Sequence, residues 1–169
     1  MSGDRRRQST HPPRTIPQLV ATDPNQVWSW DITRIPVQVQ KTPLHLYLIE
    51  DVFSRKCVGW RLEQREKDEL AAGLIEDAVL AERAKPHTLH ADGGPSMTSI
   101  EVWRILTGLG IEPSHSRPHV SNDNPFSEAL FKTLKYDLDY PRQFEDHPQA
   151  QVWVAGSWPA TTRASPQRP

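Results

Sequence analysis

Along the first sixty residues, apolar and polar positions follow the pattern of β-strands. Residues 27–35, 44–49 and 57–62 are rich in β-branched and aromatic side chains, and the first run stops before Pro36. A tight polar connection, residues 50–55, joins the second run to the third. Three strands joined in succession by short links predict an antiparallel meander.

After the third strand, the apolar residues recur at the spacing of an α-helix. They mark one face of a helix over residues 68–83 and of a second helix over about residues 99–109. Thr98 or Ser99 can cap the second helix, and Gly110 suits its end.

A third helix is expected to begin at Asn124, a favourable N-cap residue that precedes a proline. Its apolar residues recur every four positions as far as Leu138, and Pro141 ends the run. Two short strands, residues 88–91 and 111–116, are expected before this helix. The order β-β-β-α-β-α-β-α predicts an α/β domain built on one sheet.

Prolines gather towards both ends of the chain, which contains 16 of them in 169 residues. Residues 1–20 are basic and lack apolar periodicity, which predicts a disordered arm. The rest divides into a core domain over residues 21–146 and an atypical tail over residues 147–169. The tail is expected to be disordered or to result from a frameshift.

The formal net charge of −1 gives the chain no overall basic field, so any contact with nucleic acid must come from a local patch. The single cysteine, Cys57, excludes an internal disulfide and a multi-cysteine zinc site. It also suits a reducing cytoplasm. Since no apolar run approaches the roughly 18 residues of a membrane span, no membrane partner is expected.

Three acidic residues lie within or near the ends of predicted elements: Asp31 in the first strand, Asp92 just after the fourth, and Glu128 early in the last helix. Alternation places Asp31 on the same strand face as Ser29 and Thr33. Three carboxylates at one sheet edge would repel one another unless a cation lay among them. Oxygen ligands of this kind suit Mg²⁺, and two such ions can assist phosphodiester transfer.

The surroundings of these acidic residues form four segments that occur in order over roughly residues 15–146. The first places two tryptophans before the aspartate, and the last follows an Asn-Asp-Asn-Pro loop with a glutamate and two lysines. The segments are residues 25–33, 48–60, 89–94 and 116–135. They resemble the catalytic blocks of DDE-type insertion-sequence transposases, which have a retroviral-integrase-like core.

The resemblance implies a ribonuclease H-like α/β fold, in which helices flank a five-stranded mixed sheet. It implies that Asp31, Asp92 and Glu128 are the catalytic residues and hold Mg²⁺ or Mn²⁺, as two ions. The implied function is DNA transposition and integration, by metal-dependent phosphodiester cleavage and strand transfer at transposon ends. The implied partners are transposon ends, target DNA and further copies of the chain, in a bacterial cytoplasm at the nucleoid.

Four further residues are candidates for contacts with DNA. Lys132 and Lys135 share the helical face of Glu128, and the resemblance implies that they contact DNA phosphates. Arg117 and Asn122 are candidates for positioning DNA or the loop before the last helix. The alternative for the two lysines is a solvated helix face with an ordinary Glu–Lys pair.

Other residues capable of binding metal are expected to be structural. Asp51 falls in the second-strand region as a structural residue, and His90 is expected to pack beside Asp92. His115 and His119 are four residues apart, but a proline lies between them, so neither a shared helix nor a metal pair is expected.

The sequence departs from the family pattern at two places. Gly93 stands where relatives have a longer polar residue, and the elements that follow the glutamate helix in relatives are missing beyond residue 154. An upstream helix-turn-helix region is missing as well, which indicates a core truncated at both ends. The alternative function is therefore a catalytically inactive transposase remnant with at most weak binding of DNA or subunits.

Overall fold

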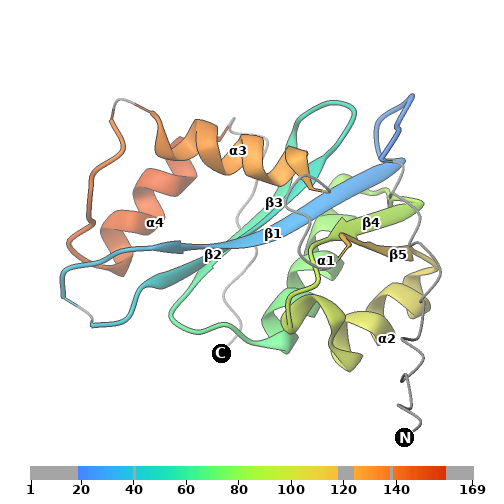
Figure 1. The fold of residues 1–169 in the computed structure, drawn as a ribbon, viewed down its shortest axis with the longest axis horizontal. Coiled ribbons are helices and arrows are strands. Elements are labelled where there is room, and N and C mark those ends of the chain that lie inside the picture. Colours follow the sequence, from blue (N-terminus) through green and yellow to red (C-terminus); the bar gives the residue numbers. More distant parts are fainter. Residues whose placement is uncertain (1–18, 40, 118–123, 138, 159–169) are drawn as a thin grey trace, which may run out of the picture.

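A mixed five-stranded sheet forms the centre of the structure, a computed structural model that describes residues 19–39, 41–117, 124–137 and 139–158 (Figure 1). β1 to β3 form the predicted antiparallel meander, β4 runs parallel to β1, and β5 runs parallel to β4. In the order β3-β2-β1-β4-β5 across the sheet, the strands are β1 (Val27–Ile35), β2 (Leu44–Asp51), β3 (Cys57–Glu63), β4 (Thr88–Ala91) and β5 (Glu112–His115).

Helices cover both faces of this sheet (Figure 1). One face carries α1 (Asp68–Glu82) and α2 (Ile100–Leu109), with the short 3-10 helix η1 (Ser96–Thr98) leading into α2. The other face carries α3 (Pro125–Lys135) and α4 (His147–Gly156). Within the described residues, no helix has the length and apolar character that crossing a bilayer requires.

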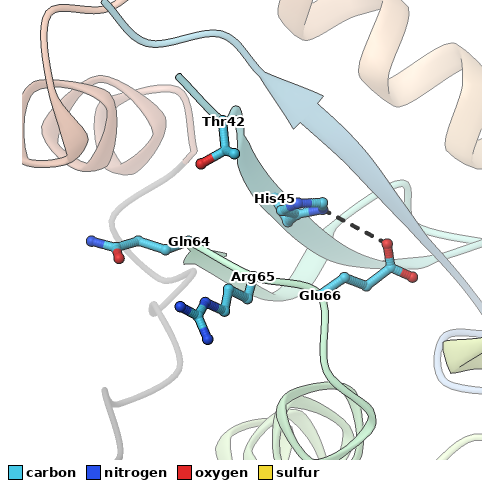
Figure 2. A pocket seen from close by; sticks show the side chains of 5 residues that line it. All are labelled: Thr42, His45, Gln64, Arg65 and Glu66. Carbon is cyan, nitrogen blue, oxygen red and sulfur yellow. Dashed lines mark ion pairs between the residues drawn. The ribbon is translucent and has the colours of Figure 1, made fainter. Parts of the chain in front are cut away.

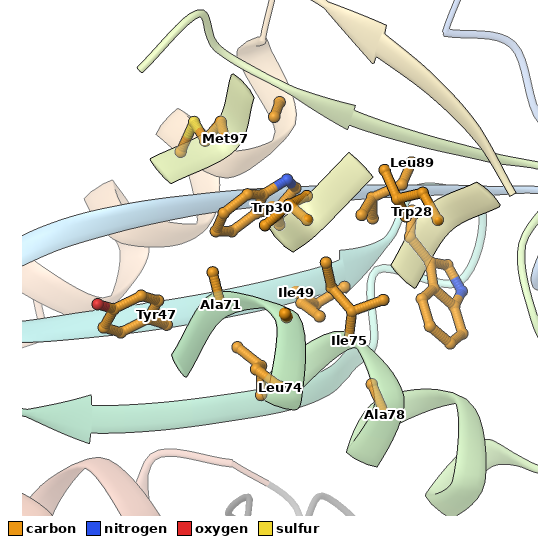
Figure 3. Close-up of a cluster of buried hydrophobic side chains, with 14 of the residues drawn as sticks. Trp28, Trp30, Tyr47, Ile49, Ala71, Leu74, Ile75, Ala78, Leu89 and Met97 are labelled. Atoms are coloured by element: carbon orange, nitrogen blue, oxygen red, sulfur yellow. The ribbon is translucent and has the colours of Figure 1, made fainter. Parts of the chain in front are cut away.

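The alternation of side chains along β1 separates two hydrophobic cores. Trp28 and Trp30 are fully buried beneath α1 and α2, among Tyr47, Ile49 and Leu74 (Figure 3). The intervening residues of β1 face α3 instead, because successive side chains of a strand point to opposite faces. The face of β1 that meets α3 is therefore polar from Ser29 to Thr33, and Ile35 at the end of the strand contributes to the second core.

Local signals in the sequence correctly predicted both ends of α2. The Oγ of Ser99 accepts a hydrogen bond from the Val102 N–H at 3.3 Å, which is the expected N-cap. Gly110 adopts the left-handed conformation with φ of +67°, where a side chain would cause strain, and ends the helix.

The helix α3 begins where the sequence predicted, with Pro125 as its first residue, but it differs from the prediction in its capping and in its C-terminal end. Asn124 stands at the N-cap position, but it makes no capping bond, because its Oδ1 accepts a hydrogen bond from Ser29 instead. The helix ends at Lys135 rather than near Pro141. The chain then turns so that Phe144 can pair with Val37 beside β1, which a longer α3 would not allow.

The helix α4 occupies residues that were expected to lie in an irregular tail, so that prediction is wrong for residues 147–156. Asp146 caps the helix by accepting a bond from the Gln149 N–H at 2.9 Å. Ala150 and Val154 are fully buried against Phe144. Two buried positions were too few to produce a recognisable apolar period. The arm up to residue 18 and the tail from residue 159 lie outside the described residues.

Candidate active site

The helix α3 is fastened along the polar face of β1 by hydrogen bonds at both of its ends. At its start, the Ser29 hydroxyl donates to Asn124 Oδ1 at 2.6 Å and lies 2.8 Å from the Ser127 hydroxyl. At its end, Lys135 Nζ donates to Thr33 Oγ1 at 2.7 Å. Ser29 and Thr33 therefore share a face, as the alternation predicted, and Asp31 lies between them on that face.

The parallel pairing of β1 with β4 brings the second aspartate beside the first. Ser29 is the register partner of His90. Continuing this register by two residues sets Asp92 next to Asp31 on the same face of the neighbouring strand. The backbone turns directly after Asp92, whose Oδ1 accepts a hydrogen bond from the Gly94 N–H at 2.9 Å.

The third carboxylate comes from the first turn of α3. Glu128 follows Ser127 directly, and Ser127 is held against β1 by Ser29. The side chain of Glu128 is exposed, and so is that of Asp92, whereas Asp31 is partly covered. The three predicted carboxylates thus come from β1, from the end of β4 and from α3, and they gather on one side of the sheet.

The surroundings of Asp31 raise the pKa of its carboxyl group from 3.8 to about 7. Burial is the largest cause, and the negative charges of Asp92 and Glu128 raise the pKa further. The Ile32 N–H, at 2.7 Å from Asp31 Oδ1, and the more distant Lys135 ammonium act in the opposite direction. Asp92 and Glu128 are thus close enough for their charges to act on the Asp31 carboxyl group.

The donor set suits a hard divalent cation, because carboxylate oxygens are the ligands that Mg²⁺ prefers. The hydrogen bonds to the Ile32 and Gly94 amides each use one oxygen of Asp31 and Asp92, which leaves the second oxygen for a cation. As the side chains stand, no group of three His, Cys, Asp or Glu residues within the described ranges is close enough to hold a metal ion. Binding would therefore require the exposed Asp92 and Glu128 side chains to turn inwards.

The predicted DNA-contacting residues are distributed unevenly around this site. Lys135 points to β1, where it reaches Thr33 and acts on the charge of Asp31. Lys132 is exposed, and its Nζ lies 5.8 Å from the centre of the Tyr136 ring. Arg117 follows β5 and is partly buried, whereas Asn122 lies outside the described residues.

Asp51 occupies a structural position, in agreement with its prediction. Its side chain is buried at the end of β2. Oδ1 accepts a hydrogen bond from the Asn25 N–H at 2.9 Å, and Oδ2 accepts from the Ser54 N–H at 2.9 Å and from the Ser54 hydroxyl at 2.5 Å. The carboxylate therefore ties the residues before β1 to the turn after β2.

Replacing Asp51 with alanine is expected to lower the free energy of unfolding by about 3 kcal/mol, since hydrogen bonds to a buried carboxylate are lost together. Urea denaturation measures this change, and Asp23→Ala serves as a control at an exposed position. Mg²⁺ affinity is expected to stay unchanged. A stable Asp51→Ala protein that no longer bound Mg²⁺ would instead make Asp51 a metal ligand.

The histidines near the site also serve the fold. His90 is fully buried, with Nδ1 at 3.0 Å from the Ser114 hydroxyl and Nε2 at 3.2 Å from the Ser116 hydroxyl. His115 Nδ1 lies 3.4 Å from the backbone oxygen of Asp92. His119, the other half of the disfavoured metal pair, lies outside the described residues.

A polar groove is lined by Thr42, His45, Gln64, Arg65 and Glu66 (Figure 2). His45 Nδ1 lies 3.7 Å from Glu66 Oε2, and the other oxygen of Glu66 accepts a hydrogen bond from the Ser96 hydroxyl at 2.9 Å. His45 lies two residues before Tyr47 on β2, so it shares the α1-facing side of the sheet with Tyr47, opposite to the face of Asp31. The groove is separate from the three carboxylates.

Sequence reasoning did not assign roles to Ser29, Asn124 and Ser127 as a group, although all three are buried around the start of α3. One signal was available, because Ser29 lies two residues before Asp31 and must share its face. The partners of Ser29 on α3 depend on tertiary packing and were not predictable from spacing.

The fold is that of integrase catalytic cores. The simian T-cell lymphotropic virus intasome, in complex with a PP2A regulatory subunit, contains a chain that superposes with a TM-score of 0.65 at 24% identity, over 86% of this chain and 54% of that one. The HTLV-2 integrase catalytic core, solved with magnesium, superposes with a TM-score of 0.54 at 22% identity, over 78% and 86%. The ribonuclease H-like fold expected from the resemblance is therefore confirmed.

The sequence comparisons narrow the class further. Residues 21–121 match the integrase core domain. The chain is 36% identical over 149 residues to the transposase for insertion sequence element IS904 of Lactococcus lactis subsp. lactis, covering 87% of this chain and 58% of that protein. It is 30% identical over 129 residues to the putative transposase InsK for insertion sequence element IS150 of Escherichia coli, covering 75% and 44%.

The chain belongs to the integrase core domain family, in the group that includes insertion-sequence transposases. It spans about half the length of these curated relatives.

Proposed function

We propose that this chain is the catalytic core of an insertion-sequence transposase, which cleaves DNA at transposon ends and joins the ends to target DNA. The convergence of Asp31, Asp92 and Glu128 on one side of the sheet carries this proposal, because the negative charges of Asp92 and Glu128 act on Asp31. Asp31 and Asp92 gain their proximity from the β1–β4 register, and Glu128 from the fastening of α3.

The three carboxylates are the proposed ligands of a divalent cation, Mg²⁺ or Mn²⁺, as two ions. When bound, such ions supply an activated attacking oxygen and stabilise the leaving oxygen of the phosphodiester. Burial and, to a smaller extent, the charges of Asp92 and Glu128 raise the pKa of Asp31, and a bound cation would offset that repulsion. The HTLV-2 integrase core, a relative in fold, was solved with magnesium.

The lysines of α3 are the proposed contacts to DNA phosphates. Lys132 is exposed on the helix that carries Glu128, and it can approach a strand held over the site. Lys135 donates a hydrogen bond to Thr33, so in the chain without DNA it holds the end of α3 against β1. Arg117 and Asn122 lie between β5 and α3 in the sequence and are proposed to position the DNA end.

The proposed partners are transposon ends, target DNA and further copies of the chain, in the bacterial cytoplasm at the nucleoid. The relatives in fold include an intasome and a core described in a dimeric form. With a net charge of −1, the chain as a whole does not attract DNA. The attraction must therefore come from a local patch of basic side chains.

Incubation of the purified chain with a supercoiled plasmid and with duplexes carrying the ends of its element tests this function. Nicking and strand joining are expected with Mg²⁺ or Mn²⁺ and are expected to stop when EDTA removes the metal. A chain that binds Mn²⁺ but cleaves neither substrate would instead be an inactive remnant.

A further inference from the structure

A row of polar side chains crosses the sheet beneath the start of α3. Ser29 on β1 is the register partner of Glu50 on β2 and of His90 on β4, and His90 pairs in turn with Ser114 on β5. Glu50, Ser29 and His90 are all buried. On β1, the row lies two residues before Asp31 and on the same face of the sheet. A buried polar row at this place needs an explanation, since apolar residues would fill the space with less cost.

The helix α3 rests on this row through Ser29. The Ser29 hydroxyl has one proton, which it donates to Asn124 Oδ1 at 2.6 Å. Ser29 therefore accepts from the Ser127 hydroxyl at 2.8 Å. Both bonds are buried, and the second residue is the immediate neighbour of Glu128. Ser29 thus joins the strand of one carboxylate to the helix of another.

Stability alone does not account for this arrangement. In the described part of the chain, Asn124 Nδ2 and Glu50 Oε2 are buried without a hydrogen-bond partner, which costs free energy. Hydrogen bonds are directional, whereas apolar contacts allow a helix to slide or rotate. A short rotation of α3 would carry the exposed Glu128 away from Asp31 and Asp92.

We propose that Ser29, with Asn124 and Ser127, positions Glu128: the three residues form a latch that sets the rotation of α3 over β1. The inference rests on the proposed function, since Glu128 is needed there as a metal ligand. Ser29 is fully buried and bonded to residues at the start of α3, so it is proposed as a positioning residue that acts through the helix.

The test compares Ser29→Ala and Ser127→Ala with Ser114→Ala. Ser114 belongs to the same polar row, but its hydroxyl pairs with His90 rather than with α3. Hydrogen exchange of the α3 amides is measured in metal-free protein, and Mn²⁺ affinity is measured by electron paramagnetic resonance. In both latch variants, the α3 amides are expected to exchange about tenfold faster, and the dissociation constant for Mn²⁺ is expected to rise about tenfold. The β1–β2 amides are expected to stay protected. Ser114→Ala is expected to leave α3 exchange and Mn²⁺ affinity unchanged.

Unchanged α3 exchange and Mn²⁺ affinity in both latch variants would overturn the proposal. Faster α3 exchange with unchanged Mn²⁺ affinity would overturn it too, because the bonds would then support the helix without positioning Glu128. If Ser29→Ala fails to fold, Ser127→Ala decides the question, since it removes one bond and leaves the sheet intact. A wild-type chain that binds no Mn²⁺ would refute the metal site itself, and the latch would be rejected with it. Mn²⁺ binding without DNA cleavage would refute only the proposed activity, and the latch would still be decided by exchange and affinity.

Discussion

Replacing Glu128 with glutamine is expected to slow Mg²⁺-dependent nicking by at least about three orders of magnitude, which corresponds to about 4 kcal/mol of transition-state stabilisation. Glutamine keeps the size of the side chain but removes the charge that is proposed to bind the cation. Asp92→Asn is expected to have a similar effect. Both side chains are exposed, so their replacement should leave the fold intact.

Glu101→Gln is the matched control for this experiment, because Glu101 lies in the first turn of α2 as Glu128 lies in the first turn of α3. Its side chain is paired with Arg104 at the surface. The control should nick DNA at the wild-type rate. If Glu128→Gln also nicked at that rate, the proposed enzyme would have to be abandoned.

Replacing Asp31 with asparagine is expected to stabilise the metal-free chain at pH 8 by about 2–4 kcal/mol. The pKa of Asp31 is about 7 in the folded chain and 3.8 in the reference state, so folding opposes its ionisation. A shift of about three pKa units corresponds to roughly 4 kcal/mol, which is an upper bound for this cost. Asparagine carries no charge, so the folded variant does not bear the free-energy cost of ionising a buried carboxyl group.

The pH dependence of this gain follows from the same shift. Between pH 3.8 and about 7, the folded chain binds more protons at Asp31 than the unfolded chain does, so stability falls as the pH rises. The cost is absent below pH 3.8 and complete above about pH 7. The stabilisation by Asp31→Asn should therefore disappear near pH 4, while Asp23→Asn at an exposed position should have little effect at either pH.

Thermal or urea denaturation in EDTA at pH 4 and pH 8 measures this difference. Adding Mg²⁺ at pH 8 should then stabilise the wild-type chain and leave Asp31→Asn unchanged, because a ligand stabilises only the state that binds it. The same carboxylate would then lower the stability of the metal-free fold and bind the cation on which the proposed activity depends. If the wild-type chain were more stable than Asp31→Asn in EDTA at pH 8, ionised Asp31 would not destabilise the fold, and this prediction would be wrong.

The local elements were largely predictable from the sequence, because their signals lie within a few residues. Ser99 and Gly110 bounded α2, and alternation placed Asp31 with Ser29 and Thr33. The same reasoning failed for α4, whose few buried residues leave no clear apolar period, and for the end of α3. Those boundaries depend on where distant segments pack.

The sequence by itself determined the identity of the three candidate carboxylates and the strand face of Asp31. Only the tertiary structure brings them to one side of the sheet: the parallel register of β1 with β4 sets Asp92 beside Asp31, and Ser29 holds the helix of Glu128 against the same face. The physical reason is the range of the interactions. Periodicity and capping act between residues a few positions apart, whereas strand order, register and helix docking join residues nearly one hundred positions apart, such as Ser29 and Ser127.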